Sequence, residues 1–191
     1  MRIGILALQG AFAEHSHVVE RLGVEALDVR LPSQLHGLDG LIIPGGESTT
    51  MSQLMAEYQL LQPLKDLAKK GLPILGTCAG MILMAKSVPD LGLQTLGLMD
   101  VTVRRNAFGS QVDSFEADLE VPALGQPSFH AVFIRAPVIE AAGSTVEILA
   151  RLRDGAAVAA RQGKLLAIAF HPELTPDARF HRFFLDIVAS R

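Results

Sequence analysis

The stretch PILGTCAGMILMAK, residues 73–86, contains an apolar run, the only cysteine of the chain and a helical pattern, in that order. Pro73 to Gly76 predict a buried strand, and Ala79 to Lys86 predict the helix that follows it. Between them, the segment GTCAG has the G-x-C-x-G form of a nucleophile elbow, the sharp strand-to-helix turn that exposes one side chain at a sheet edge. The stretch therefore predicts an α/β fold with Cys78 as a candidate nucleophile.

A cysteine can also be a small buried hydrophobe, and for an isolated cysteine that interpretation is the better one. The two glycines that flank Cys78 favour the catalytic interpretation instead, provided that a base lies elsewhere in the chain. The backbone N–H of Ala79 would then lie at a helix N-terminus. There it could meet an oxyanion and favour the thiolate.

Outward from this stretch, the first half of the chain alternates short apolar runs with helical patterns. We expect strands at 2–8, 25–29 and 40–43, and helices at 13–22 and 49–70. From Gly97 to about Arg161 the pattern becomes short and alternating, which predicts added antiparallel strands at 101–103, 114–116, 131–134 and 156–160. A last buried strand at 165–170 precedes a helix at 179–189.

This order predicts a single-domain, flavodoxin-like three-layer sandwich over residues 1–191, with a mostly parallel central sheet plus the added antiparallel strands. The composition is that of an ordinary globular protein, since 49% of the residues are hydrophobic and 19% are charged. A net charge of −3 without a basic stripe argues against nucleic acid as a partner. A lone cysteine and short apolar runs argue against disulfides and membrane spans, so we expect a cytoplasmic protein.

A cysteine nucleophile needs a base, and the chain has six histidines. His171 directly follows a predicted buried strand, and Pro172 biases it to an extended conformation. Glu173, two residues on, can then face the same cavity and hold the tautomer of the imidazole. Alone, His-Pro-Glu is a weak signal that is more typical of a strand-end turn with a surface His–Glu pair, but with the elbow it suggests a Cys-His-Glu triad. The sequence gives no obvious reason to assign a catalytic role to the other histidines. His15 and His17 lie in a polar helix start, His36 lies in a loop, His130 begins a strand, and His181 lies among phenylalanines.

The loop PGGEST, residues 44–49, also follows a predicted buried strand. Its glycines permit a close backbone approach to a ligand, and the N–H of Gly46 is a candidate second oxyanion donor beside that of Ala79. The alternative role of the loop is to cap the following helix through Ser48 or Thr49.

Together these segments resemble class I glutamine amidotransferase domains, and more closely the family of glutaminase subunits of pyridoxal 5′-phosphate synthase (the PdxT/SNO family). The resemblance covers essentially the whole chain. The segments that carry it are GILALQG (4–10), PGGESTT (44–50), GTCAG (76–80), RRNAFG (104–109), DSFE (113–116), VFIRAP (132–137) and FHPELT (170–175).

The resemblance implies that Cys78 forms a glutamyl thioester with L-glutamine, assisted by His171 and Glu173. The ammonia would pass to a synthase subunit of the PdxS/SNZ type in a large hetero-oligomer that makes pyridoxal 5′-phosphate. It implies no metal and no cofactor for this chain, and a low activity until the synthase docks. The matched positions place around the glutamine Gly46, Glu47, Ser48, Arg105, Ile134 and Arg135.

Guanidinium groups suit the α-carboxylate of glutamine, although a lone arginine more often forms a structural or solvated ion pair. Gln9 and Gly10 are the candidate docking residues, and we expect a peptide flip near Gly45-Gly46 on docking.

Three alternatives stay open from the residues. One is a glutaminase that serves another acceptor, the second is a cysteine hydrolase of the same general fold, and the third is a non-catalytic regulatory subunit.

Overall fold

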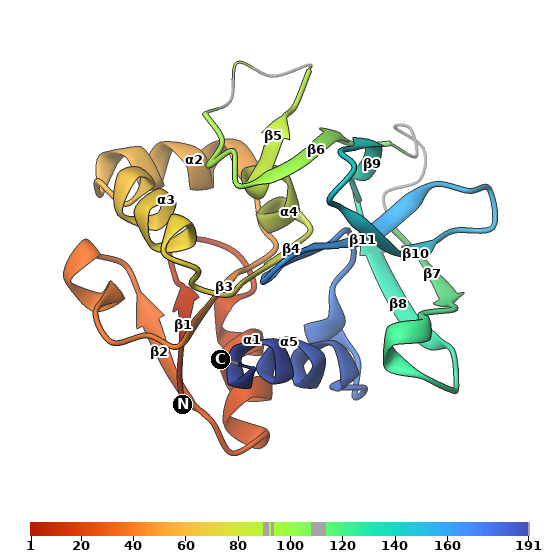
Figure 1. Cartoon of the computed structure of the whole chain (residues 1–191), viewed down its shortest axis with the longest axis horizontal. Helices are drawn as coiled ribbons and strands as arrows, with labels where there is room; N and C mark the ends of the chain where they lie inside the picture. The colour runs from red at the N-terminus through yellow and green to blue at the C-terminus, as the bar shows by residue number, and fades with distance from the viewer. Residues whose placement is uncertain (90–91, 93, 108–113, 191) are drawn as a thin grey trace.

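A large mixed sheet forms the centre of the computed structural model, which describes residues 1–89, 92, 94–107 and 114–190 (Figure 1). Its parallel part consists of β1 (Arg2–Leu6), β2 (Glu25–Val29), β3 (Gly40–Ile43), β4 (Ile74–Thr77) and β12 (Leu165–Ile168). These strands lie in the order β2-β1-β3-β4-β12, and each neighbouring pair is parallel. The order is that of flavodoxin-like sheets, which confirms the predicted fold class.

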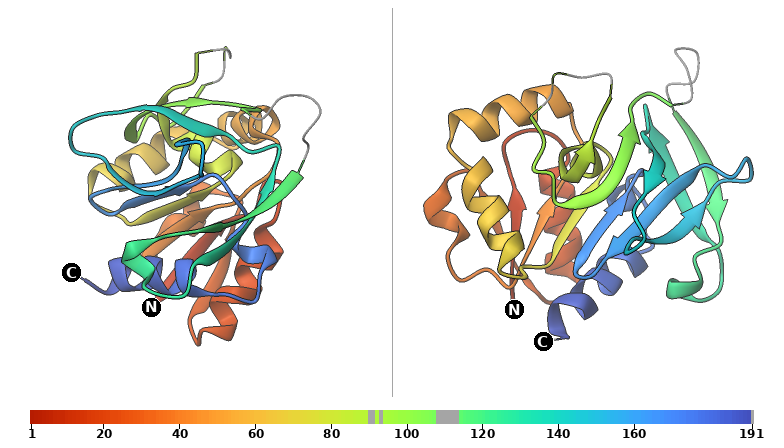
Figure 2. Two further views of the ribbon diagram at one scale, coloured as in Figure 1. Left: turned by 90° about the vertical axis from the view of Figure 1, so that its right-hand side faces the viewer. Right: turned by 45° about the horizontal axis from the view of Figure 1, so that its top comes forward.

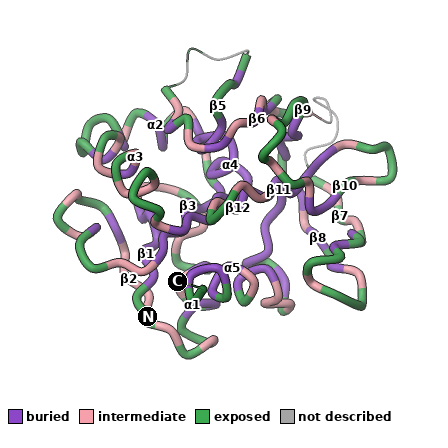
Figure 3. The backbone as a smooth tube through the Cα atoms, in the orientation of Figure 1, coloured by how far each residue is buried: buried purple, intermediate pink, exposed green. Residues whose placement is uncertain are grey.

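The central strands are apolar because both of their faces are covered. Every residue of β3 and β4 is buried, as are the last four residues of β1. Figure 3 shows this buried band running through the middle of the molecule. The continuous apolar runs of the sequence are therefore the interior layer of the fold.

Helices cover the two faces of this sheet and make the three layers (Figures 1 and 2). On one face lie α1 (Phe12–Arg21) and α5 (Arg179–Ala189). On the other face lie α2 (Ser48–Glu57), α3 (Leu61–Lys69) and α4 (Ala79–Met84). The described residues also contain three short 3-10 turns: η1 (Pro32–Leu35), η2 (Pro122–Leu124) and η3 (Pro172–Leu174).

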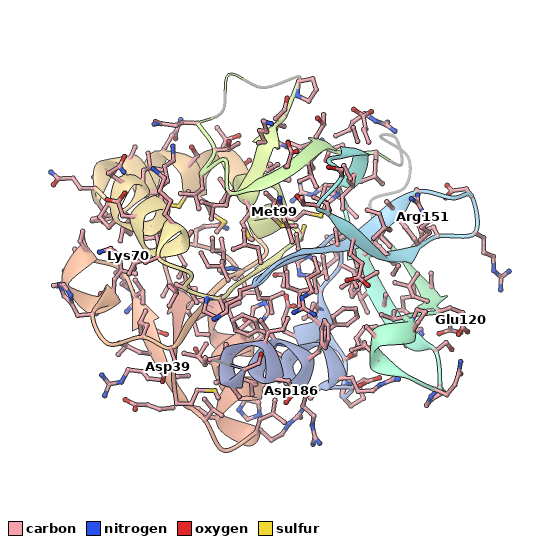
Figure 4. All side chains as sticks on the ribbon, in the orientation of Figure 1. Asp39, Lys70, Met99, Glu120, Arg151 and Asp186 are labelled. Atoms are coloured by element: carbon pink, nitrogen blue, oxygen red, sulfur yellow. The ribbon has the colours of Figure 1, made fainter. Side chains whose placement is uncertain are left out.

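The helix α5 packs through an aromatic cluster. Phe180 makes an edge-to-face contact with Phe129 at 4.8 Å between ring centroids, and another with Phe170 at 5.2 Å. Figure 4, in which Asp186 marks α5, shows side chains filling the space between this helix and the sheet. The cluster holds the end of the chain against the segment that carries His171.

The second half of the chain extends the sheet with mainly antiparallel strands. These are β5 (Ala85–Ser87), β6 (Met99–Arg104), β9 (Val138–Ala142), β10 (Glu147–Arg151) and β11 (Ala157–Gln162). A separate two-stranded ribbon consists of β7 (Ser114–Leu119) and β8 (Phe129–Ile134). The prediction of added antiparallel strands is confirmed, but it missed β9 and β10, and β5 pairs with β6 in parallel.

The predicted helix 49–70 is wrong as a single element, because the chain breaks between α2 and α3. Gln59 has a φ of 57°, in the left-handed region, and the next helix starts at Leu61. Pro63 then falls in the first turn of α3, where its missing N–H interrupts no helical hydrogen bond. That proline was the available signal for a new helix start. The predicted helix 79–86 is also too long, since α4 ends at Met84 and β5 follows.

Within the described part of the chain, none of the helices combines the length and apolar character that crossing a bilayer requires. Phe108, Gly109 and Asp113, which belong to two of the quoted segments, lie outside the described residues.

Candidate active site

A cavity of about 250 Å³ opens at the carboxyl ends of the parallel strands, where open α/β sheets bind their ligands. This volume is small for a ligand pocket, which suits a small metabolite. The cavity brings together most of the residues predicted for the site, from loops that follow different strands. Its lining consists of Gln9, Gly46, Glu47, Ser48, Cys78, Ile82, Arg105, Asn106, Ile134, Arg135 and His171.

Cys78 sits in a strained turn between β4 and α4. Its φ is 49° and its ψ is −103°, and its backbone N–H donates to the carbonyl of Ile168 on β12 at 2.8 Å. A non-glycine residue at such a positive φ is uncommon and typical of a nucleophile elbow. The thiol is mostly buried, with 7% of the residue exposed, and it lines the cavity.

The glycines around Cys78 are required for close packing. A Cβ on Gly80 would collide with the backbone carbonyl of Ile43, and one on Gly76 would collide with Met84 and the backbone of Gly80. A Cβ on Gly45 would strike the imidazole of His171 and lie 3.3 Å from the Cβ of Cys78. The missing side chains therefore let three loops meet at Cys78.

His171 and Glu173 follow β12 and meet in the same place. Nδ1 of His171 lies 2.7 Å from Oε1 of Glu173, and both residues are buried. The backbone N–H of His171 donates to the carbonyl of Val132 on β8 at 2.9 Å, which fixes this segment against the ribbon. The structure thus places the predicted base and the predicted orienting group in hydrogen-bond contact.

Charge favours a protonated His171. Burial by itself would lower the pKa of His171, but the hydrogen bonds and charges of Cys78 and Glu173 outweigh it and raise this pKa to about 10. Burial by itself would raise the pKa of Glu173, but the facing imidazoles of His15 and His171 keep that pKa below its ordinary value of 4.5. At neutral pH the site therefore holds a carboxylate next to an imidazolium.

Two histidines behind Glu173 were missed from the sequence. His15 was assigned to a polar helix start but is fully buried, and His181, expected among phenylalanines, is fully buried as well. Nε2 of His15 lies 3.3 Å from Oε2 of Glu173, whereas His17 is exposed. The spacing of His15 with Val18 and Val19, i to i+3 and i+4, was a signal for its burial but not for its partners.

The helix α2, which follows the loop after β3, has Glu47 as its N-cap and not Ser48 or Thr49. The carboxylate of Glu47 accepts from the N–H of Thr49 at 3.1 Å and from the N–H of Thr50 at 2.7 Å. Burial opposes ionisation, but these bonds lower the pKa of Glu47 to about 2. A guanidinium nitrogen of Arg105 lies 3.5 Å from the same carboxylate.

The loop after β1 contacts the loop after β3 at two points. The Gln9 side chain accepts from the N–H of Glu47 at 2.7 Å, and the carbonyl of Gly45 accepts from the N–H of Ala11 at 3.0 Å. Gly10, with a φ of 95°, lies so close that a Cβ there would collide with the Gly45 carbonyl. The two predicted docking residues are therefore in direct contact with the candidate oxyanion loop.

The remaining predicted residues surround the mouth of the cavity. The carbonyl of Ile134 lies 3.8 Å from Sγ of Cys78, and Arg135 is exposed with a φ of 42°. Ser48 is buried, and its hydroxyl has no hydrogen-bond partner among the described residues. Ala79 is buried at the first turn of α4, next to Cys78. Ile82 and Asn106 line the cavity as well and were not predicted as site residues.

Comparison with known proteins gives consistent matches along the chain. The model of the SNO glutamine amidotransferase family matches residues 5–190. A protein of Herpetosiphon aurantiacus described as pyridoxal 5′-phosphate synthase subunit PdxT is 60% identical, covering 98% of this chain and 100% of that protein. A protein of Dehalococcoides mccartyi with the same description is 58% identical, covering 100% of this chain and 98% of its own. A crystal structure described as a glutamine amidotransferase superposes with a TM-score of 0.92 at 50% identity, covering 98% of each chain.

Proposed function

The chain belongs to the SNO glutamine amidotransferase family, and from this premise we propose that it is the glutaminase subunit of a pyridoxal 5′-phosphate synthase. It hydrolyses L-glutamine to L-glutamate and ammonia. The observation that carries the chemistry is that Cys78 and His171 line one cavity while His171 contacts the buried Glu173 at 2.7 Å. The relatives that are 58% and 60% identical along their whole length support the assignment to this synthase.

In the first half of the reaction, the Cys78 thiolate attacks the side-chain carbonyl carbon of glutamine. The carbonyl oxygen becomes an oxyanion, for which the N–H groups of Gly46 and Ala79 are the proposed donors. The His171 imidazolium gives its proton to the amide nitrogen, the C–N bond breaks, and ammonia leaves a glutamyl thioester. The raised pKa of His171 supports its role as the acid of this step.

In the second half, His171 is neutral and acts as the base. It takes a proton from water, whose oxygen attacks the thioester carbonyl, and the C–S bond then breaks to release glutamate and the thiolate. Glu173 stays ionised and stabilises the imidazolium that forms again. The sum is one glutamine and one water converted to glutamate and ammonia.

The cavity offers complementary groups for the rest of the substrate. We assign the α-carboxylate of glutamine to Arg105 and Arg135, because both line the cavity and guanidinium groups bind carboxylates well. Ser48 supplies a buried hydroxyl that has no hydrogen-bond partner among the residues the structure describes. Gly46, Glu47 and Ile134 complete the wall around the glutamine.

A synthase subunit is the proposed partner, in a large hetero-oligomer, and Gln9 with Gly10 is the proposed docking point. A partner at these residues acts on the oxyanion loop through the Gln9–Glu47 and Ala11–Gly45 hydrogen bonds. Rotation of the Gly45-Gly46 peptide on docking would then turn on the activity. Without the synthase, the subunit would release little ammonia.

The test is an ammonia-release assay with glutamine, with and without the synthase subunit. We expect strong release only from the wild-type complex and none above background from Cys78→Ala in the same complex. Gln59→Ala, a substitution at the exposed break between α2 and α3, serves as the control that keeps the activity. Release that is equally high without the synthase would contradict the activation model, and no release under either condition would refute the function.

A further inference from the structure

Two buried histidines form a polar chain behind the triad, and the reaction as described uses neither. Nε2 of His15 lies 3.2 Å from the hydroxyl of Thr77, and Nδ1 lies 2.9 Å from Nε2 of His181. Thr77 is the residue immediately before Cys78, and His15 also faces Glu173. Four elements, α1, β4, η3 and α5, therefore meet at the His15 imidazole.

The neighbours of His15 determine its tautomer. An ionised carboxylate only accepts hydrogen bonds, and a neutral imidazole has one N–H and one lone pair. With the proton on Nδ1, the lone pair of Nε2 would face Oε2 of Glu173 at 3.3 Å without compensation in a dry interior. With the proton on Nε2, the N–H points at the Thr77 hydroxyl and presents its positive end to Oε2. Nδ1 then accepts from His181.

This assignment of protons also explains why one buried ring nitrogen of His181 has no partner within the described residues. Nδ1 of His181 has no hydrogen-bond partner within the described residues, as expected if it is the unprotonated end of the chain. Each N–H then points in the same direction, from His181 to His15 and from His15 toward Glu173 and Thr77. The chain ends on the carboxylate that orients the base.

Burial keeps the two imidazoles neutral. Burial lowers the pKa of His15 below 6.5, with Glu173 and Glu14 opposing this and His171 adding to it. Burial and His15 lower the pKa of His181 to about 3, with Glu173 opposing and the more distant Arg21 adding to the effect. His15 thus offers a dipole and not a second cation that would compete with the His171 imidazolium.

We propose that His15 is a positioning residue for the glutaminase reaction, which holds Oε2 of Glu173 and the Thr77 hydroxyl through its Nε2–H. Oε2 makes no hydrogen bond within the described residues; its contact with Nε2 of His15 at 3.3 Å is electrostatic, and the terminal torsion of a glutamate is soft. Without His15 the carboxylate can rotate and lose its alignment with His171. Because Thr77 precedes Cys78 in the chain, the same imidazole also fixes the position of Cys78 relative to His171.

The proposal rests on the glutaminase function given above, and it is tested in the complex with the synthase. The measurements are kcat, KM and the pH dependence of kcat/KM for glutamine hydrolysis. His15→Leu should lower kcat by about 10- to 100-fold, as misplacement of a catalytic group does, with KM within about twofold. The alkaline limb of the pH profile should move to lower pH, because a misaligned carboxylate stabilises the His171 imidazolium less.

Matched variants separate positioning from packing. His15→Gln carries an amide N–H to the place of Nε2 and should restore most of kcat, whereas the shorter His15→Asn should not. His181→Phe removes a buried imidazole from the same cluster without touching Glu173, and it should keep kcat within about threefold of wild type. If His15→Leu does not fold, the kcat values of His15→Gln and His15→Asn are compared instead, and a higher kcat for His15→Gln supports the positioning role.

Three outcomes overturn the inference: wild-type kcat in His15→Leu, equal activity of the Gln and Asn variants, or an equal loss in His181→Phe with an unmoved pH profile. A wild-type complex that is silent on glutamine would instead refute the function itself. If the wild-type complex hydrolyses glutamine and substitution of His15 does not change kcat, only the positioning role is refuted.

Discussion

The capping carboxylate of Glu47 gives a stability prediction that can be worked from the structure. The change is Glu47→Gln, which keeps the side-chain length but removes the charge that accepts from the N–H groups of Thr49 and Thr50. A pKa of about 2 in the folded chain against 4.5 corresponds to roughly 3.4 kcal/mol at neutral pH as an upper bound. The side chain is 43% exposed, so water screens this interaction, and the range for helix caps indicates about 1–2 kcal/mol.

The sign of the pH dependence follows from a lowered folded-state pKa. The stabilisation is fully present above pH 4.5 and is lost as the pH falls toward 2, so less than half of it remains at about pH 3. Urea unfolding followed by circular dichroism, at pH 7 and at pH 3.5, should show the gap between wild type and Glu47→Gln narrowing in acid. Glu57→Gln, at the opposite end of the same helix, is the control and should be neutral or slightly stabilising. A gap that is the same at both pH values would refute the reasoning.

Two further predictions concern the elbow and the substrate. Gly80→Ala should lower the free energy of unfolding in urea by about 1–3 kcal/mol, because the new Cβ would collide with the Ile43 carbonyl. Helix propensity alone would favour alanine by about 1 kcal/mol. A variant as stable as wild type would contradict the close packing at Gly80. Arg105→Met should raise the KM for glutamine by about 10- to 100-fold in the complex, the loss of one charge-assisted contact, whereas Arg104→Met, which breaks a surface pair with Glu140, should leave KM unchanged; equal effects would exclude carboxylate binding by Arg105.

The parts of the fold that follow from local pattern were predictable. The strands at 25–29 and 40–43 and the helix at 179–189 have the predicted bounds. The strand at 40–43 and the helix have a clear apolar pattern, whereas the strand at 25–29 was the weaker candidate. The break at Gln59 was missed because a left-handed residue other than glycine leaves little trace in the sequence. The strand β10 was missed because its pairing partner β11 lies further along the chain, and strand preference depends on such neighbours.

Some residues of the candidate site could be predicted from the sequence and others could not. Cys78, His171 and Glu173 could be found because each follows a strand, and the topology of parallel sheets gathers such positions. His15 and His181 could not, because their partners come from α1, β4, η3 and α5 together, and no short segment contains that information. The role of Glu47 as the helix cap was likewise hidden, since Ser48 and Thr49 beside it are equally good capping residues.

The place of β12 between β4 and β11 has a consequence for synthesis of the chain. During translation, Cys78 on the elbow leaves the ribosome long before residues 165–173, which supply both the missing neighbour of β4 and the proposed base. Until then, the β4 edge has no partner on that side and Cys78 has no imidazole beside it. Assembly of the site is therefore coupled to the last long-range pairing of the sheet, a step of high contact order. A growing chain accordingly carries the Cys78 thiol before the residues of its proposed triad have been made.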